Sequence, residues 1–404
     1  MAQEEQQERE PQYSDEFRTA YPPVDALVNE QQDYDAARAQ IPSLVASATT
    51  PDDKNVAGGL LFKLGQSLSD SQVQLQGINL MLESNLGGPV RQGQLRYATY
   101  SLYEDAGDLE AARAALEEAA SSGYATEGQL TDGTKITIDG DYMRLMAAET
   151  YFQNDQTREG LAYVDNLVSQ KMDANELPSE RLLSRALGEA FGADLLDDAG
   201  RYSVLLVKYF PNEMNWKNAL AVERAKPYGD PISLDLLRLA SRTDNLETDR
   251  DYSDYIQAAD VNRLPAEVNR VFSEMMAKGV LENSPENTAY ANELRSDISD
   301  RLENDREDLP ALEADARGAG ASATLVTRTA DSFFSHENYA TAEELYDLAL
   351  TKADSDRDLL YTRKGIAQIE QGKFSEALGT LAQVQGQRKQ VADLWAAYAQ
   401  QQMS

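Results

Sequence analysis

Apolar residues along this chain recur at spacings of three and four, the spacing of one face of an α-helix. A longer pattern occurs four times: a large residue, Ala three positions later, a large apolar residue four positions after that, and a small or apolar residue three further on. The copies are Tyr34, Ala37, Ile41 and Leu44; Leu109, Ala112, Leu116 and Ala119; Tyr339, Ala342, Tyr346 and Ala349; and Phe374, Ala377, Leu381 and Val384. A small residue at a fixed place lets a second helix approach closely. The repetition predicts an all-α fold, an α-solenoid of stacked antiparallel helix pairs.

Breaks in this pattern suggest how the chain is divided. Residues 1–20 are rich in Glu and Gln and have few apolar anchors, so we expect a disordered acidic tail. Helical repeats then fill residues 21–225, and Pro227, Gly229 and Pro231 mark a joint before a second region, residues 226–404. Lys135, Ile136, Thr137 and Ile138 resemble a strand, although an extended loop between helices is the favoured interpretation.

The C-terminal copies resemble the tetratricopeptide repeat, a unit of about 34 residues that forms two antiparallel helices. Gly372, Phe374, Ala377 and Leu378 match the centre of the family motif, and Tyr361 and Gly365 stand at its upstream bulky and small positions. The resemblance is clearest in units at 323–357 and 358–391, followed by a capping helix at 391–400. Elsewhere it is divergent: the Tyr34 copy has Gln32 where the family has glycine. As a whole the chain is similar to the acidic repeat proteins that α-proteobacteria export to the periplasm.

Composition narrows the choice of partner and compartment. The chain has 37 Lys and Arg against 69 Asp and Glu, a formal net charge of −32. This charge repels phosphate backbones and anionic lipids, so nucleic acid is excluded as a partner and a basic or apolar protein segment is favoured. Alternatively, the net charge serves only to keep the protein soluble and indicates no particular partner. No apolar run approaches the roughly 20 residues of a transmembrane helix.

Two features suggest export. The chain lacks cysteine, which rules out disulfides and thiolate metal sites and suits an oxidising compartment. Ala2, Gln3 and Glu4 are typical of the sequence after a cleaved export signal, so we expect Met1 to stand in place of that signal. We therefore expect a periplasmic protein, with a cytoplasmic location as the alternative.

The resemblance implies which positions face the inner groove of the superhelix. These groove candidates are Tyr97, Ser101, Thr327, Asp331, Phe334, Thr362, Ile366 and Ile369. Repeat domains of this family that bind chaperone tails carry Lys, Asn and Arg at such places, and this chain does not, which argues against an acidic peptide tail as ligand. Tyr97, Tyr100 and Tyr103 form a stripe that fits either an aromatic platform or packing between helix pairs.

No residue set has the spacing of a catalytic or metal site. Asp354, Asp356 and Asp358 alternate as in a calcium loop, but Leu359 stands where the turn needs glycine, so we interpret them as turn and cap residues. His336 is the only histidine and is expected in a surface turn. We therefore expect no enzyme activity, metal or cofactor.

Together these features predict a non-enzymatic scaffold or adaptor that holds a protein or peptide segment in the concave groove, in the bacterial cell envelope. A solenoid that encloses a small molecule or glycan is the alternative, and a carboxylate-based hydrolase a remote one. The sequence carries no signal for oligomeric state.

Overall fold

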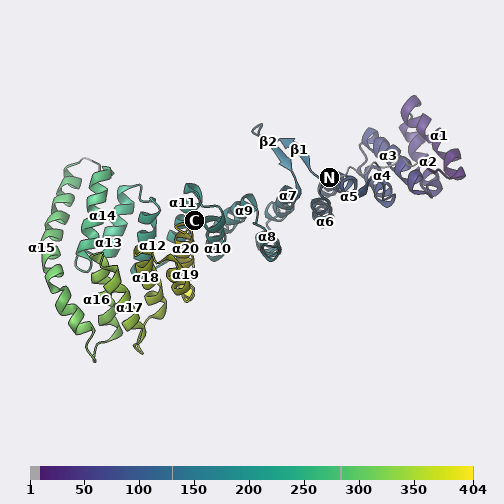
Figure 1. Ribbon diagram of the computed structural model, residues 1–404. Coiled ribbons are helices and arrows are strands. Elements are labelled where there is room, and N and C mark those ends of the chain that lie inside the picture. The colour runs from purple at the N-terminus through teal and green to yellow at the C-terminus, as the bar shows by residue number, and fades with distance from the viewer. Residues whose placement is uncertain (1–9, 130, 283, 404) are drawn as a thin grey trace. The chain divides into compact units, whose positions relative to one another are not determined.

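The computed structural model describes residues 10–129, 131–282 and 284–403, and nearly all regular structure within them is helical (Figure 1). The all-α solenoid prediction is confirmed: helices follow one another as antiparallel neighbours, and Ala342 and Ala377 of the repeat pattern are fully buried. The chain forms two compact units, Met1–Asn166 (unit 1) and Leu167–Ser404 (unit 2).

Unit 1 is a row of helix pairs with one small β-hairpin. Its elements are α1 (Asp15–Ala26), η1 (Leu27–Gln31), α2 (Tyr34–Ser47), α3 (Pro51–Leu68), α4 (Ser71–Glu83), α5 (Gly88–Asp105), α6 (Leu109–Ser121), β1 (Thr126–Gln129), β2 (Lys135–Ile138), α7 (Gly140–Phe152) and the first part of α8 (Thr157–Asp173). Polar residues in the turns start many of these helices. The side chains of Asp33, Asp70 and Asp108, for example, accept hydrogen bonds from backbone N–H groups in the first turn of the helix that follows.

Helices α3 and α4 approach unusually closely because glycines face each other at their crossing. A Cβ atom at Gly58 would lie 2.5 Å from the carbonyl oxygen of Gly77, and one at Gly77 would lie 2.6 Å from that of Gly58. The adjacent Gly59 has nothing within 4 Å of its Cβ position. The absence of side chains at Gly58 and Gly77 is therefore what permits this contact.

Unit 2 begins with the last residues of α8 and contains the rest of the helices. They are α9 (Glu180–Gly192), α10 (Leu196–Tyr209), α11 (Glu213–Arg224), α12 (Asp230–Arg242), α13 (Asp249–Ala259), α14 (Pro265–Lys278), α15 (Pro285–Ala316), α16 (Ala323–Ser335), α17 (Tyr339–Leu350), α18 (Arg357–Glu370), α19 (Phe374–Leu381), the 3₁₀ turn η2 (Gly386–Arg388) and α20 (Lys389–Gln401). We call α9–α14 the first arm and α16–α20 the second arm; the 32-residue helix α15 joins them.

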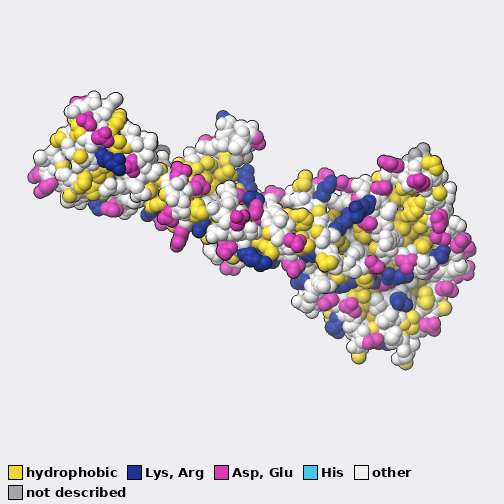
Figure 2. All heavy atoms as spheres, turned by 180° about the vertical axis from the view of Figure 1, so that it is seen from behind, with side chains coloured by type: hydrophobic (Ala, Val, Ile, Leu, Met, Phe, Trp, Pro, Cys, Tyr) yellow, Lys and Arg dark blue, Asp and Glu magenta, His cyan; other side chains and the backbone are white. Residues whose placement is uncertain are grey.

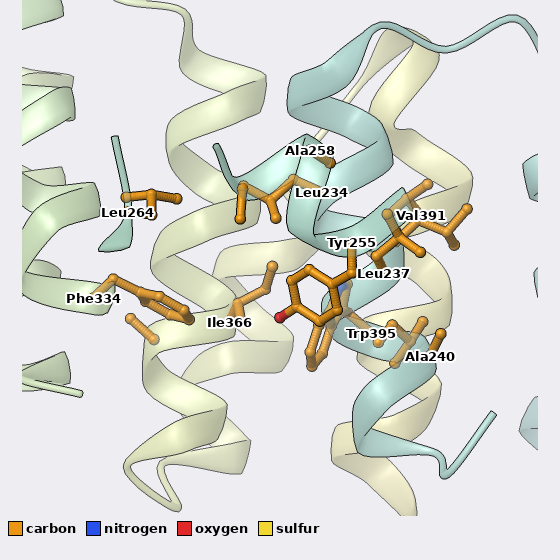
Figure 3. Packing of buried hydrophobic residues seen from close by; sticks show 14 of the residues in the cluster. Leu234, Leu237, Ala240, Tyr255, Ala258, Leu264, Phe334, Ile366, Val391 and Trp395 are labelled. Carbon is orange, nitrogen blue, oxygen red and sulfur yellow. The ribbon is translucent and has the colours of Figure 1, made fainter. Parts of the chain in front are cut away.

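The second arm folds back along the first, so that helices of the two arms pack against each other within unit 2 (Figure 1). Even-numbered helices form an inner layer in which α12 contacts α18 and α20, α14 contacts α16, and α10 contacts α20. One hydrophobic core runs through both arms, from Val207 to Ala399. In the close-up, Leu234 and Tyr255 of the first arm lie near Ile366 and Trp395 of the second (Figure 3). Burial of this shared face is the main force holding the arms together.

Charged residues are buried inside this interface as well. Three carboxylates (Asp235, Glu267 and Asp331) and three guanidinium groups (Arg238, Arg363 and Arg388) are at most 6% exposed, so their charges balance. Asp235 of α12 bonds Arg363 of α18 at 3.3 Å and Arg388 of η2 at 2.6 Å. The indole N–H of Trp395 donates to the Asp235 carbonyl oxygen at 3.0 Å. Each buried charge is paired, so the network adds polar contacts between the arms to the apolar ones.

Three details of the predicted organisation are wrong. The division between units falls at Asn166 and Leu167 and not near residue 225, because the turn between α11 and α12 lies inside unit 2. Part of the supposed disordered tail is helical: Ser14 caps α1, and its hydroxyl donates to the Asp53 carboxylate at 2.8 Å; residues 1–9 lie outside the described residues. Lys135–Ile138 is a true strand, since it pairs with β1 in an antiparallel hairpin.

Candidate functional site

Most of the predicted groove residues lie on the inner face of the second arm, where the first arm covers them. Asp331, Phe334, Thr362, Ile366 and Ile369 are at most 5% exposed, and Thr327 is half-buried. The repeat phase places them on inner helices as expected. The inner face they belong to is filled by the protein itself, so the predicted open concave groove is absent from unit 2 as the structure describes it.

The contacts of two of these residues are structural. Asp331 accepts a hydrogen bond from the Tyr346 hydroxyl at 2.8 Å and pairs with Arg363. Phe334 packs edge-on against Tyr339, with ring centroids 5.0 Å apart, and the Arg238 guanidinium lies 4.4 Å from its ring centroid. Both side chains therefore serve the core of unit 2.

The other two candidates lie on α5 of unit 1. Tyr97 is half-buried and its ring centroid lies 5.9 Å from that of Tyr124, while Ser101 is exposed. Burial raises the pKa of Tyr97 above its ordinary value. Tyr97 and Tyr100 both pack against the core formed by α6 and α7. The structure therefore places this part of the tyrosine stripe between helix pairs.

The aspartates and the histidine flagged in the sequence have structural partners. Asp356 caps α18 through the backbone N–H of Leu359 at 3.1 Å, and Asp358 accepts the N–H of Gln385 at 2.8 Å. His336 is in a turn, with its Nε2 atom 2.6 Å from an oxygen of Asp305. Within the described ranges no group of three or more His, Asp or Glu side chains could hold a metal ion.

A hollow of about 540 Å³ opens on the surface of unit 1 along α4. Its lining consists of Val45 from α2, Gln72, Leu75, Gln76, Asn79, Leu80 and Glu83 from α4, and Tyr103, Ala106 and Asp108 at the end of α5 and the following turn. We call it the α4 hollow. The helical period places its polar residues on one side of α4, while Val73, Gly77 and Ile78 on the other side are buried toward α3.

One wall of the α4 hollow consists of polar side-chain amides that are available for hydrogen bonding. Gln72, Gln76 and Asn79 are exposed, and their side-chain amides make no hydrogen bond within the described part of the chain. Leu75 and Leu80 are nearly buried, at 8% and 7% exposure, and form an apolar floor. Each amide offers both donors and an acceptor, so the wall suits a ligand with alternating carbonyl and N–H groups, such as a peptide backbone.

The charges of the α4 hollow are acidic. Glu83 pairs with Lys54 at 2.8 Å, and the Asp108 carboxylate caps α6 by accepting the N–H of Ala111 at 3.1 Å. Among the residues that the structure describes, no lysine or arginine lines the hollow. Sequence reasoning missed this site, although the spacing of four and three between Gln72, Gln76 and Asn79 opposite a buried apolar face was a readable signal.

Comparison with known proteins adds little beyond the fold. No protein-family model matches the chain, and no curated protein matches it. Among solved structures, the chain is similar to that of Naa15/Naa10 bound to HypK-THB, with 13% identity, a TM-score of 0.26, and coverage of 94% of this chain and 64% of that one. It is also similar to the TPR domain of P58(IPK), with 11% identity, a TM-score of 0.22, and coverage of 96% and 98%. The assignment of the fold rests on the helix packing described above.

In the described residues, no helix combines the length and the apolar character required to span a bilayer.

Proposed function

We propose that the protein is a non-enzymatic scaffold that binds a segment of a partner protein in the α4 hollow of unit 1. The observation that carries this proposal is the row of exposed amides at Gln72, Gln76 and Asn79 above an apolar floor. This site takes the place of the concave groove predicted on the second arm, where Thr327 is half-buried and the other candidates are at most 5% exposed.

The spacing of the amides fits an extended peptide. Residues four apart on a helix lie about 6 Å apart along its axis. Alternate residues of an extended chain lie about 6.8 Å apart, and they present their side chains to the same side. Gln72 and Gln76 can therefore pair with backbone groups of alternate peptide residues, while apolar side chains of the peptide reach Leu75 and Leu80.

The chemistry of the segment follows from the lining. Because Glu83 and Asp108 are the charged residues of the hollow, a neutral or basic peptide is favoured over an acidic one. One of the two similar solved structures is, by its description, a complex of Naa15 and Naa10 bound to HypK-THB. Protein binding by this chain remains our proposal and does not depend on them.

We further propose that the protein acts in the bacterial cell envelope, as expected for an acidic repeat protein of the periplasm. The lack of cysteine suits an oxidising compartment, and the net charge of −32 matches the acidic character of the exported repeat proteins that the sequence resembles. Fractionation of cells that express the native gene with a C-terminal tag tests it: recovery with the cytoplasmic fraction would contradict it.

The binding proposal is tested by selecting peptides from a random library on the full chain and measuring their affinity by fluorescence anisotropy. Each side-chain hydrogen bond contributes about 0.5–1.5 kcal/mol, so Gln76→Ala with Asn79→Ala should weaken a selected peptide about 5- to 150-fold. The control is Gln66→Ala, an exposed glutamine of α3 outside the hollow.

Two outcomes would overturn the proposal. Selected peptides whose affinity is unaffected by the double variant bind elsewhere. Binding of an oligosaccharide panel at the same amides, with no peptide selected, would instead favour the glycan-binding alternative, because amides and an aromatic ring also suit sugars.

A further inference from the structure

Unit 2 carries a second, larger hollow at one end of its helical layers. It has a volume of about 840 Å³ and brings together the start of α11, the loop between α12 and α13, the residues after α14 and the end of α20. Its lining residues are Pro211, Asn212, Glu213, Trp216, Thr243, Asp244, Leu246, Glu247, Lys278, Val280 and Gln401. We call it the α11 hollow. It lies wholly within unit 2.

The floor of the α11 hollow is apolar and rigid. Trp216 and Leu246 are 6% and 1% exposed and belong to the core of unit 2. The indole N–H of Trp216 donates to the Gln401 side chain at 3.3 Å, and the Trp216 ring meets Tyr398 edge-on at 6.5 Å between centroids. An aromatic residue fixed in this way offers an apolar surface without a cost of ordering it.

Exposed methionines are next to the lining in the sequence at three separate places. Met214 follows Glu213 and is 63% exposed, Met276 precedes Lys278 by two residues and is 41% exposed, and Met403 follows Gln401 by two residues and is 55% exposed. These are three of the eight large hydrophobic side chains that are exposed in the described chain. Unbranched thioether side chains adapt to the shape of an apolar partner, and exposed apolar groups rimmed by polar ones mark docking surfaces.

The rim of the α11 hollow is acidic. Three carboxylates line it, on Glu213, Asp244 and Glu247, against one lysine, Lys278. Lys278 pairs with Asp244 at 2.8 Å, and Glu247 pairs with Lys217 at 2.8 Å. The side chains of both pairs are 37% to 88% exposed, so each pair contributes little to stability and can give way to a cationic ligand. Glu213 makes no ion pair with any residue that the structure describes.

On the face that Figure 2 shows, acidic side chains are scattered over both units, and on unit 2 some of them lie beside hydrophobic patches. In the α11 hollow these two properties coincide with a fixed aromatic floor. This combination favours a partner that is both cationic and apolar. It repels an acidic segment and gives a purely polar one nothing to bury.

We propose that the α11 hollow is a docking site for a cationic amphipathic segment of a partner protein. A large apolar side chain of the segment enters the hollow against Pro211, Trp216 and Val280. Its Lys or Arg residues reach Glu213, Asp244 and Glu247. This site is separate from the α4 hollow and goes beyond the function proposed for unit 1.

The test is carried out on the full chain, with its nine methionines labelled by ¹³C at the methyl group. The probe is an amphipathic peptide of leucine and lysine, and its counterpart with glutamate in place of lysine is the charge control. We expect saturable shifts of the Met214, Met276 and Met403 methyl resonances with the cationic peptide and none with the anionic one. The buried Met143 of unit 1 should not shift.

A matched pair of variants separates docking from general charge attraction. Glu213→Gln, Asp244→Asn and Glu247→Gln together should reduce the affinity for the cationic peptide at least tenfold. Glu303→Gln, Glu307→Gln and Asp308→Asn remove the same charge from exposed positions of α15 and should change the affinity less than twofold. Circular dichroism checks that both variants are folded.

The proposal is overturned if the three methyl resonances do not shift, if both variants weaken binding equally, or if the anionic peptide binds as well as the cationic one. The α4 variant Gln76→Ala with Asn79→Ala should leave the methionine shifts unchanged. Loss of the shifts in that variant would also contradict two separate sites. The proposals for the α4 hollow and for the α11 hollow can therefore fail independently of each other.

Discussion

The carboxylate of Asp235 and the guanidinium group of Arg363 bond at 3.3 Å although 128 residues separate them in the sequence. Asp235 lies on α12 in the first arm of unit 2, and Arg363 on α18 in the second. Both side chains are at most 2% exposed. This pair connects the repeats with the clearest resemblance to the tetratricopeptide family to helices in which the resemblance is divergent, and it lies in the interface where the first arm covers the predicted groove positions.

Removing the Asp235 carboxylate, which binds both Arg363 and Arg388, should strongly lower the free energy of unfolding of unit 2. Asp235→Ala leaves Arg388 without its 2.6 Å partner and takes one of two partners from Arg363. Breaking a buried pair by removing one member costs about 3–5 kcal/mol, because a charge stays buried without compensation. Both tryptophans, Trp216 and Trp395, lie in unit 2, so urea unfolding followed by their fluorescence reports this unit.

The control for this measurement is Glu303→Ala, an exposed position of α15 that should change the free energy of unfolding by less than about 0.5 kcal/mol. An Asp235→Ala protein with the urea midpoint of the parent would contradict a stabilising role for the network.

Acid should weaken unit 2 through the same network. Burial by itself raises the pKa of Asp235 and of Glu267, but the neighbouring guanidinium groups outweigh it and hold both pKa values below their usual range. The unfolded chain then binds more protons as pH falls through the ordinary carboxyl range, about 4 to 4.5. The stabilisation from these two groups is complete above that range and is lost as pH falls through their folded pKa values.

The measurement is the urea midpoint of the tryptophan transition at a series of pH values from 7 to 3. We expect a plateau near neutral pH and a decline below about pH 4.5. In Asp235→Asn the decline should be shallower, since one of the two groups no longer titrates. A parent protein whose midpoint stays level down to pH 3 would argue against this assignment.

Much of the repeat architecture was predictable because it depends on local patterns. Tyr346 and Ala349 of the repeat pattern are fully buried on α17, and Asn338 caps that helix through the N–H of Thr341. Spacing and cap residues are visible in a single stretch of sequence. They specify that a helix forms and which of its faces is apolar.

The closure of unit 2 was not predictable by the same means, because an apolar helix face does not say what covers it. Leu234, Leu236, Leu237 and Leu239 of α12 form an apolar run that also contains Asp235 and Arg238. Charges within such a run were a hint of buried pairing, but their partners lie on other helices. The partner of the Lys135–Ile138 strand was hidden for another reason: β1 reads Thr126, Glu127, Gly128, Gln129, in which Thr126 alone is a residue that favours strands.

The crossing of α3 and α4 should tolerate no side chain at its glycines. Gly58→Ala and Gly77→Ala each place a methyl group against backbone atoms, and such overpacking costs about 1–3 kcal/mol. Gly59→Ala is the matched control on the same helix: its Cβ position is open, and alanine should stabilise the helix by about 0.5–1 kcal/mol. Unit 1 contains no tryptophan, so its unfolding is followed by far-UV circular dichroism while the tryptophan transition serves as an internal reference. If Gly58→Ala and Gly59→Ala shift that signal in the same direction, the close contact is not required.

Substitution of Phe334 distinguishes a core residue from a groove residue. Phe334 is 3% exposed between Arg238 and Tyr339, so Phe334→Ala should cost about 3–5 kcal/mol and lower the urea midpoint of the tryptophan transition. Phe191→Ala, at a side chain of α9 that is 44% exposed, should cost far less.

Neither change should alter the affinity of a peptide selected for the α4 hollow, because that site lies in unit 1. The opposite pattern is equally measurable. If Phe334→Ala left unit 2 as stable as the parent and abolished peptide binding, the inner face of the second arm would have to be open in solution. The groove expected from the repeat phase would then be the binding site, and the buried network around Asp235 would have to open when the partner binds.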